Sequence, residues 1–205
     1  MHTVDYDSPE DFAGQRVVIV GGGNSAAQIV AEVSEVAQTL WVAQRPPRFM
    51  PDDVDGRVLF DVATAREAAQ KAGFEHDGVS GLGDIVMVPP VRAARDRGDL
   101  HASPIFEQIA PTGVSWSDGS VYSCDAIIWC TGFKPQLHHL RSLGLTWEDG
   151  HPVTDGTQSV DIPGLHLLGY GDWTGFASAT IIGAARSARS AVESVGKCFG
   201  GPQQD

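Results

Sequence analysis

A short apolar run that ends in three consecutive glycines constrains the fold of this chain more than any other stretch of its sequence. Residues 17–20 are Val, Val, Ile and Val, and such an unbroken β-branched run is typical of a strand buried on both faces. Glycines occupy positions 21–23, and apolar residues then recur at the three- and four-residue intervals of an amphipathic helix. This helical pattern comprises Ala26, Ile29, Val30, Val33, Val36, Ala37 and Leu40. A strand, a glycine turn and a helix in this order predict the first βαβ unit of a dinucleotide-binding, Rossmann-like domain.

The spacing of the small residues agrees with that prediction, since Gly21, Gly23 and Ala26 match the pattern G-x-G-x-x-G/A. The first glycine permits the tight turn, the second lets a pyrophosphate approach the backbone, and the alanine lets the helix pack closely on the strand. The free N–H groups and the dipole of the helix N-terminus would then face the phosphates. The candidate cofactor-binding residues of this turn are Gly21, Gly22, Gly23, Asn24, Ser25 and Ala26. A glycine turn without a ligand is the alternative interpretation.

A second strand is expected over residues 39–44, and the residues at its end indicate which nicotinamide nucleotide the domain prefers. About 20 residues after the glycines, an NAD-specific domain usually carries an Asp or Glu for the ribose 2′-hydroxyl group. This chain has Gln44 and Arg45 there instead. A carboxylate would repel a 2′-phosphate, whereas an arginine can bind it through two hydrogen bonds. The sequence therefore predicts NADPH as the preferred nucleotide. Arg45 is favoured over Arg48 as the residue that binds the 2′-phosphate, because it stands directly at the strand end. The alternative is that both arginines are solvated surface residues.

The composition is that of a globular protein that avoids anionic partners. The 205 residues are 42% hydrophobic, which suits one or two domains with a sizeable core. The formal net charge of −12 disfavours nucleic acid and anionic membrane surfaces as partners. No apolar run nears the roughly 20 residues of a membrane span, and residues 1–7 lack the pattern of a signal peptide. The cysteines at 124, 130 and 198 have neither metal-ligand nor C-x-x-C spacing, so we expect reduced thiols, a cytoplasmic location and no metal site.

Between the second strand and residue 125 the sequence predicts helices and short strands. Apolar periodicity predicts the helices, and turn residues separate the strands. In chain order, the expected segments are a helix at 58–72, an irregular run at 74–84, a strand at 85–88, a helix at 91–97 and three strands of a β-meander at 105–110, 113–117 and 120–123.

A second buried strand of note is expected at residues 126–130, which are Ala, Ile, Ile, Trp and Cys. It ends in Thr131 and Gly132, and a Thr-Gly turn lets the backbone pass close to a bound nucleotide. An ordinary glycine turn is an equally supported alternative. A short helix at 137–145 and a polar loop at 147–159 are expected to follow.

The strand, glycine turn and helix pattern recurs near the end of the sequence. An apolar strand at 165–169 precedes a loop that contains Gly171, Asp172 and Trp173, and a long helix is expected from residue 177. The apolar residues on one side of that helix are Ile181, Ile182, Ala185, Ala188, Val192 and Val195.

Three segments in a fixed order carry a resemblance to a known family. They are GGGNSAAQI at 21–29, CTGFKP at 130–135 and GYGDW at 169–173. This ordered set resembles the second half of the flavin-containing monooxygenase-like, FAD-dependent NAD(P)H oxidoreductases. The segment 89–98, PPVRAARDRG, resembles a bacterial branch of that family, the arsenic-operon flavoproteins.

The resemblance implies an α/β fold: a Rossmann-like NAD(P)-binding domain with a parallel sheet and a β-meander, plus the C-terminal part of an incomplete FAD-binding Rossmann-like domain. The implied parts are a linker at 1–8, the NAD(P)H-binding domain at 9–125 and the C-terminal portion of the FAD-binding domain at 126–205. Thr131 and Gly132 would lie where the chain crosses between the domains. Asp172, with Gly171 and Trp173 beside it, would meet the flavin ribityl chain, and the next helix would point its N-terminus at the flavin ring.

The resemblance further implies an NADPH-dependent flavoprotein that passes hydride to FAD and then oxygenates a small substrate. The first FAD fingerprint of the family does not occur in these 205 residues, so we expect a truncated chain, with a separate N-terminal FAD-binding half as a candidate partner. A non-catalytic NADP(H)-binding module is one alternative, and an NADPH:flavin or disulfide reductase without oxygenation is another. The sequence assigns no catalytic residue, no substrate and no oligomeric state.

Overall fold

The computed structural model describes residues 1–54, 57–58, 65, 84–175 and 178–199. The chain divides into two compact units, Met1–Gly132 (unit 1) and Phe133–Asp205 (unit 2), which are described separately. The helix expected at 58–72 and the irregular run at 74–84 lie outside the described residues, apart from positions 58, 65 and 84.

Unit 1 is built on a four-stranded parallel sheet. Its strands are β1 (Arg16–Val20), β2 (Gln38–Ala43), β3 (Ala102–Pro104) and β7 (Ala126–Trp129), in the order β3-β2-β1-β7. The central strand β1 pairs with β2 on one side and with β7 on the other, and its residues from Val17 onward are almost fully buried. This agrees with the β-branched run in the sequence, because only a central strand covered on both faces needs such a run.

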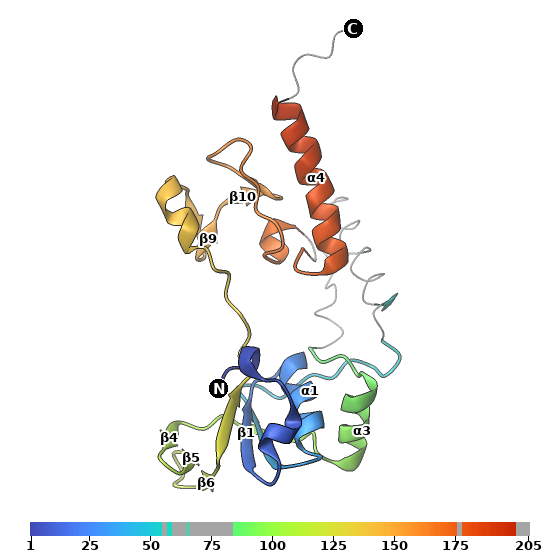
Figure 1. Cartoon of the computed structure of the whole chain (residues 1–205), viewed down its shortest axis with the longest axis vertical. Helices are drawn as coiled ribbons and strands as arrows, with labels where there is room; N and C mark the ends of the chain where they lie inside the picture. Colours follow the sequence, from blue (N-terminus) through green and yellow to red (C-terminus); the bar gives the residue numbers. More distant parts are fainter. Residues whose placement is uncertain (55–56, 59–64, 66–83, 176–177, 200–205) are drawn as a thin grey trace. The chain divides into compact units, whose positions relative to one another are not determined.

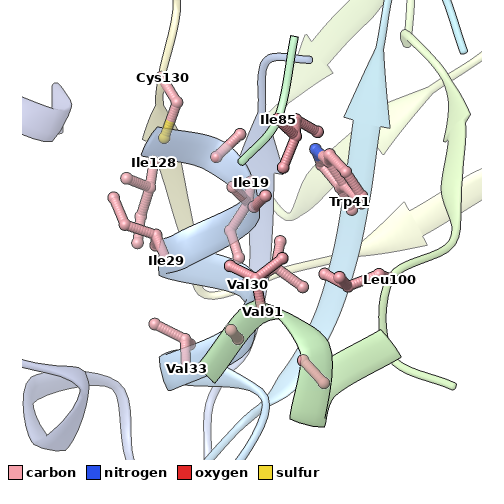
Figure 2. Packing of buried hydrophobic residues seen from close by; sticks show 14 of the residues in the cluster. Ile19, Ile29, Val30, Val33, Trp41, Ile85, Val91, Leu100, Ile128 and Cys130 are labelled. Carbon is pink, nitrogen blue, oxygen red and sulfur yellow. The ribbon is translucent and has the colours of Figure 1, made fainter. Parts of the chain in front are cut away.

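Two helices cover one face of this sheet, α1 (Asn24–Val33) and α3 (Pro89–Arg97). Val17 and Ile19 belong to the cluster on this side, together with the apolar face of α1, and Figure 2 labels Ile19 there. Figure 2 also shows Val91 of α3 and Trp41 of β2 at the same cluster. Prolines at the start of α3 suit the first helical turn, and a left-handed Gly98 ends it, as the sequence predicts for residues 91–97.

The expected β-meander covers the other face. Its strands β4 (Gln108–Ala110), β5 (Gly113–Ser115) and β6 (Val121–Ser123) form an antiparallel sheet (Figure 1). The alternate residues of β1 and β2 pack here, because successive side chains of a strand point to opposite faces. The buried residues of this second cluster are Val18, Val20, Val42, Phe106 and Val114.

Residues 1–8, expected as a linker, belong to unit 1. The Met1 amino group donates to the Ile127 carbonyl at 2.9 Å, and His2 forms a parallel bridge with Trp129. Short 3₁₀ turns follow at Thr3–Asp5 and Pro9–Phe12. The two compact units divide after Gly132, and β7 is hydrogen-bonded into the sheet of unit 1. The functional division expected after residue 125 stays a prediction.

Unit 2 consists of short elements and one long helix. Its elements are η4 (His138–Leu143), β8 (Trp147–Glu148), β9 (His151–Pro152), β10 (Thr154–Asp155), β11 (Gln158–Ser159), η5 (Asp172–Thr174) and α4 (Ile181–Phe199). The strands form two small hairpins, β8-β9 and β10-β11, within the stretch expected to be a polar loop. Four buried leucines form the hydrophobic cluster of this unit, with Trp147 of β8 and Trp173 of η5 packed against them: Leu137, Leu140, Leu145 and Leu167.

Several expected boundaries were wrong. The helix α1 ends at Val33, because the Val36 and Ala37 N–H groups both bond to the Val33 carbonyl in a tight turn, and Leu40 therefore lies in β2. The strand expected at 85–88 is a single bridge between Phe49 and Ile85. The short edge strand β3 was not expected at all.

The strand expected at 165–169 is likewise reduced to one antiparallel bridge, between Gln158 and His166. Its hydrogen bonds go to the end of the β10-β11 hairpin, since Ser159 N–H donates to the Leu165 carbonyl and Leu167 N–H to the Thr157 carbonyl. In the part of unit 2 that is described, no parallel strand lies beside this segment.

The long helix α4 buries a different side from the apolar one seen in the sequence. Ser187 and Ala191 are buried, whereas Ile181 is 92% and Val192 71% exposed. The buried side is held to the hairpin region by a bond from the Ser194 hydroxyl to the Gln158 side chain at 3.0 Å. None of the described helices is long and apolar enough to cross a membrane.

Candidate functional site

A cavity of about 440 Å³ lies at the carboxyl ends of β1, β2 and β7 in unit 1. Its lining residues are Val20, Gly21, Gly22, Ala43, Gln44, Arg45, Pro46, Asp84, Ile105, Cys130 and Thr131. The structure thus brings together the glycine turn, the end of the second strand and the Thr-Gly turn, which are far apart in the sequence. The crevice outside the carboxyl ends of parallel strands is where open α/β sheets bind their ligands.

Gly21 is fixed in shape by the backbone around it. Its φ of +141° and its close approach to β7 require glycine, because a Cβ would lie 2.3 Å from the Cys130 carbonyl oxygen. The buried Trp41 indole N–H donates to the Gly21 carbonyl at 2.6 Å, and the Gly21 N–H donates to the Val42 carbonyl at 2.9 Å. Trp41 was not among the residues expected at the site, although a tryptophan in a buried strand needs a partner for its N–H.

Gly23 is open, in contrast. No atom lies within 4 Å of the position that its Cβ would take, so packing does not explain the absence of a side chain. It is the N-cap of α1 and has no side-chain cap, and the first turn of the helix carries no acidic residue. Free N–H groups at an uncapped helix start can receive a phosphate. Ala26 is fully buried, as close packing of helix on strand requires.

Asn24 holds a distant segment against the start of α1. Its side-chain Nδ2 donates to the Asp84 carbonyl at 2.9 Å, and its Oδ1 accepts from the Val86 N–H at 2.8 Å. Both functions of this amide are therefore engaged with the backbone. Ser25, the next candidate, has an exposed side chain.

The two arginines after β2 have different surroundings. Arg48 forms a two-pronged ion pair with Asp84, with distances of 2.9 Å (Nε to Oδ2) and 2.8 Å (a terminal nitrogen to Oδ1). Arg45 lines the cavity, and among the described residues it has no ion-pair or hydrogen-bond partner. A smaller hollow of about 140 Å³ on the β3 side is also lined by Arg45. Of the two, Arg45 is the arginine whose charge is available to a ligand.

Cys130 lines the cavity as a neutral thiol. Burial raises its pKa to about 11, against a weaker opposite effect of the Thr3 side chain. Burial also raises the pKa of Cys124, and both thiols are free. A thiolate is the reactive form of cysteine, so neither residue is activated for thiol chemistry at neutral pH. Across the described residues, no group of three or more His, Cys, Asp or Glu side chains could hold a metal ion.

The glycine loop of unit 2 is held by two buried hydroxyl groups. Thr174 and Ser178 are fully buried and lie 2.8 Å apart, oxygen to oxygen. The Ser178 hydroxyl accepts from the Gly171 N–H at 3.0 Å, and both hydroxyls contact the Gly171 carbonyl. Trp173 stacks on His151 with ring centres 4.3 Å apart, so it is part of the packing of unit 2. Asp172 is the first residue of the short helix η5, which ends at Thr174. Thr174 and Ser178 were not expected from the sequence, because hydroxyl residues in a loop give no signal of burial.

Unit 1 has the parallel sheet and covering helices of a Rossmann-like fold, with a cavity at the carboxyl ends of its strands, and comparison with known proteins specifies the family. The model of the pyridine nucleotide-disulphide oxidoreductases matches residues 3–192. The chain therefore belongs to this family. The α/β fold class expected from the sequence is confirmed.

Similar proteins include oxidoreductases that use flavin and NADP. The flavin-containing monooxygenase from Stenotrophomonas maltophilia is 46% identical in sequence, with a TM-score of 0.78 over 96% of this chain and 54% of that one. An uncharacterized CzcO-like oxidoreductase of Geobacillus kaustophilus is 25% identical and matches 82% of this chain and 49% of its own length. The ferredoxin–NADP reductase of Sulfurisphaera tokodaii is 24% identical and matches 78% of this chain and 41% of its own.

The chain spans about half the length of these relatives. The resemblance to flavin monooxygenase-like oxidoreductases is confirmed, and the family and these relatives imply FAD and NADP(H) as the cofactors of the class.

Proposed function

We propose that this chain contributes the NADPH-binding domain, and part of the FAD-binding domain, of an NADPH-dependent flavoprotein monooxygenase. The observation that carries the proposal is the cavity at the ends of β1, β2 and β7, which unites the glycine turn with Arg45, an arginine that has no ion-pair partner among the described residues. Residues 9–125 would provide most of the nucleotide-binding part and residues 126–205 the flavin-binding part. The substrate would be a small molecule, because relatives with this likeness include a monooxygenase.

The two charged parts of NADPH would meet two different groups, the start of α1, which follows the cavity-lining Gly21 and Gly22, and Arg45 in the cavity itself. The uncapped start of α1 beside Gly23 would bind the pyrophosphate through its N–H groups. Arg45 would pair with the 2′-phosphate, with Gln44 beside it as a second hydrogen-bonding group. Gly22, Asn24, Ser25 and Ala26 would form the rest of the turn, and Thr131 and Gly132 would bound the far side.

In the proposed reaction, FAD would supply the redox chemistry when bound, as the acceptor of the NADPH hydride and the group that reacts with oxygen. The residues of this chain bind and orient. Trp41 fixes the glycine turn through the Gly21 carbonyl, and the buried hydroxyls of Thr174 and Ser178 keep the loop of Gly171, Asp172 and Trp173 in one shape.

The proposal includes a second polypeptide segment that completes the flavin site. The apolar side of α4, exposed at Ile181 and Val192, supports a covering partner, and the matched relatives are about twice as long. Without that segment, the chain would act as a non-catalytic NADP(H)-binding module, an alternative favoured by the fact that the whole cavity belongs to unit 1. A reductase without oxygenation remains the third reading, although the neutral thiols give no support to a disulfide-type mechanism.

Calorimetric titration of the chain with NADP⁺ and NAD⁺ tests the nucleotide proposal. Arg45→Ala should lower the affinity for NADP⁺ by about tenfold, the usual order for loss of one charged hydrogen-bonded contact. The affinity for NAD⁺ should fall by less than about twofold. Arg189→Ala, which removes the same charge from the exposed surface of α4, should change neither value. Equal losses for the two nucleotides would remove Arg45 from the 2′-phosphate site, and absence of binding to the wild-type chain would refute the proposal.

The flavin proposal needs a separate test. The chain is incubated with excess FAD, alone and together with the part of the S. maltophilia protein that it does not cover, and unbound flavin is removed. A stoichiometric visible flavin band and NADPH oxidation only in the mixture would support a half-enzyme. Oxygenated product would distinguish a monooxygenase from a reductase, which would release peroxide instead. A colourless mixture that still binds NADP⁺ would favour the binding module.

A further inference from the structure

A carboxylate lies in the same cavity as Arg45, although the end of β2 carries none. Asp84 reaches the cavity from a segment that is distant in the sequence. NAD-specific domains use an acid at the end of the second strand to bind the ribose 2′-hydroxyl group, and such a charge repels a 2′-phosphate. The cavity therefore contains groups suited to each nucleotide, one cationic and one anionic.

The Asp84 carboxylate is not free, because Arg48 holds both of its oxygens. The arginine lowers the pKa of the Asp84 carboxyl through these hydrogen bonds, and the nearby charge of Arg45 acts in the same direction. Arg48 thus neutralises most of the negative charge that Asp84 would otherwise present to a ligand.

The position of Asp84 does not depend on this ion pair alone. The Asp84 and Ile85 N–H groups both donate to the Arg48 carbonyl, at 2.8 and 3.1 Å, and the Met50 N–H donates to the Ile85 carbonyl at 2.8 Å. The Asn24 side chain holds the same segment from the other side. Ile85 is fully buried in the core of unit 1. The backbone, a side-chain amide and the core therefore fix Asp84 at the cavity even when its partner is removed.

We propose that the Arg48–Asp84 ion pair sets the selectivity of this cavity between NADPH and NADH, with Arg48 masking a carboxylate that would otherwise favour the ribose 2′-hydroxyl group over the 2′-phosphate. This inference rests on the proposed nucleotide-binding function. Loss of Arg48 leaves the Asp84 carboxylate to repel the 2′-phosphate held by Arg45 and to accept a hydrogen bond from the ribose 2′-hydroxyl group of NADH. Loss of Asp84 removes the carboxylate from the described lining and leaves the charge of Arg45 there. The two losses act on selectivity in opposite directions.

A purely structural pair makes a different prediction. The Arg48 and Asp84 side chains are 57% and 46% exposed, and ion pairs this exposed contribute little to stability. If the pair served only to hold its segment, removal of either partner would have the same consequence for both nucleotides.

The test is calorimetric titration of the full chain with NADP⁺ and with NAD⁺ at one low salt concentration, for Asp84→Asn and Arg48→Met. We expect Asp84→Asn to raise the affinity for NADP⁺ by about threefold or more and to leave the affinity for NAD⁺ unchanged or lower. We expect Arg48→Met to lower the affinity for NADP⁺ by about threefold or more and to leave the affinity for NAD⁺ unchanged or higher. Changes of this size are expected for one partly screened charge near a phosphate. The double variant should have nearly the wild-type ratio of affinities.

The chain offers a matched control pair. Arg95 and Asp52 form a similar two-pronged ion pair at 2.6 and 3.0 Å, and neither residue lines the cavity. Asp52→Asn and Arg95→Met make the same charge changes and should leave the ratio unchanged. If the ratio of NADP⁺ to NAD⁺ affinity moves in the same direction in both cavity variants, or does not move, the inference is overturned. The proposed function would still stand in that case, because the chain would bind the nucleotides. Should Arg48→Met fail to fold by circular dichroism, Asp84→Asn against Asp52→Asn decides alone. A wild-type chain that binds neither nucleotide overturns both proposals.

Discussion

The chain contains two strand, glycine turn and helix patterns, and only one of them becomes a complete βα unit. In unit 1, β1 pairs with parallel strands on both sides, and α1 buries most of one face against it. In unit 2, the corresponding apolar segment at 165–169 makes one antiparallel bridge, and α4 exposes its apolar side. The local sequences are alike, so the difference arises from neighbouring strands, which unit 1 supplies and the described part of unit 2 does not.

The two glycine turns are consequently held in different ways. Backbone groups of the sheet and the Trp41 indole fix Gly21. Two buried hydroxyls, Thr174 and Ser178, fix Gly171. The first turn depends on the sheet of unit 1 as a whole, whereas the second depends on a few side-chain hydrogen bonds.

The largest effect should come from alanine at the two glycines. Gly21→Ala places a Cβ 2.3 Å from the Cys130 carbonyl oxygen at a φ of +141°, so we expect a loss of about 3 kcal/mol or more in the free energy of unfolding. Gly171→Ala has a φ of +99° but no atom within 4 Å of the new Cβ, so only about 1–2 kcal/mol should be lost. Urea denaturation followed by far-ultraviolet circular dichroism measures both. Equal losses would show that the sheet does not hold its turn more rigidly.

Amide hydrogen exchange should then separate the two patterns directly. β1 is the central strand of its sheet and is almost fully buried from Val17 onward, whereas α4 buries few of its residues, Ser187 and Ala191 among them. We expect β1 amides to be protected at least about 100-fold more than those of residues 185–192, because local opening depends on the buried contacts that must be broken. The surface sheet of β4, β5 and β6 provides an internal reference within unit 1. Similar protection in β1 and α4 would mean that unit 2 is stabilised by something other than its small core.

The sequence predicted what local patterns determine. The β-branched run, the glycine spacing and the small Ala26 indicated β1, the turn and α1, and the position of Arg45 at the strand end indicated its place in the cavity. The meander followed from turn residues at regular intervals. In each case residues close together in the chain carry the information.

The features that were missed depend on approaches between distant segments. Asp84 enters the cavity because Asn24 and the backbone near Arg48 hold its segment there, and no pattern around residue 84 indicates this. The burial of Thr174 could not be predicted because its partners, not its polarity, determine it. The side of α4 that unit 2 buries is the side with Ser187 and Ala191, since small residues permit close approach to the hairpin region, while the pattern of large apolar residues indicated the opposite side.

A smaller effect is expected from Thr174→Val, which keeps the shape of the side chain but removes the hydroxyl group. The Tyr170 N–H would lose its acceptor, and the Ser178 hydroxyl would lose a partner, so about 1–3 kcal/mol of local stability should be lost. The Gly171 amide should exchange about tenfold faster, with β1 unchanged. Thr146→Val is the matched control, because the Thr146 hydroxyl bonds to Asp161 on the exposed surface. Unchanged exchange at Gly171 would show that the hydroxyl pair does not fix the loop.

The smallest effect on stability, and the sharpest separation of packing from binding, should come from Gly23→Ala. Its Cβ would enter open space at a φ of −111°, so the free energy of unfolding should change by less than about 0.5 kcal/mol. The same methyl group would stand where a pyrophosphate approaches the start of α1, so NADP⁺ affinity should fall by about tenfold or more. Gly196→Ala in α4 also points into open space and should leave NADP⁺ binding intact while slightly stabilising the helix. If Gly23→Ala binds NADP⁺ as the wild-type chain does, the helix start is not the phosphate site. The glycine would then need another explanation, and packing cannot provide it, because the space around its Cβ position is open.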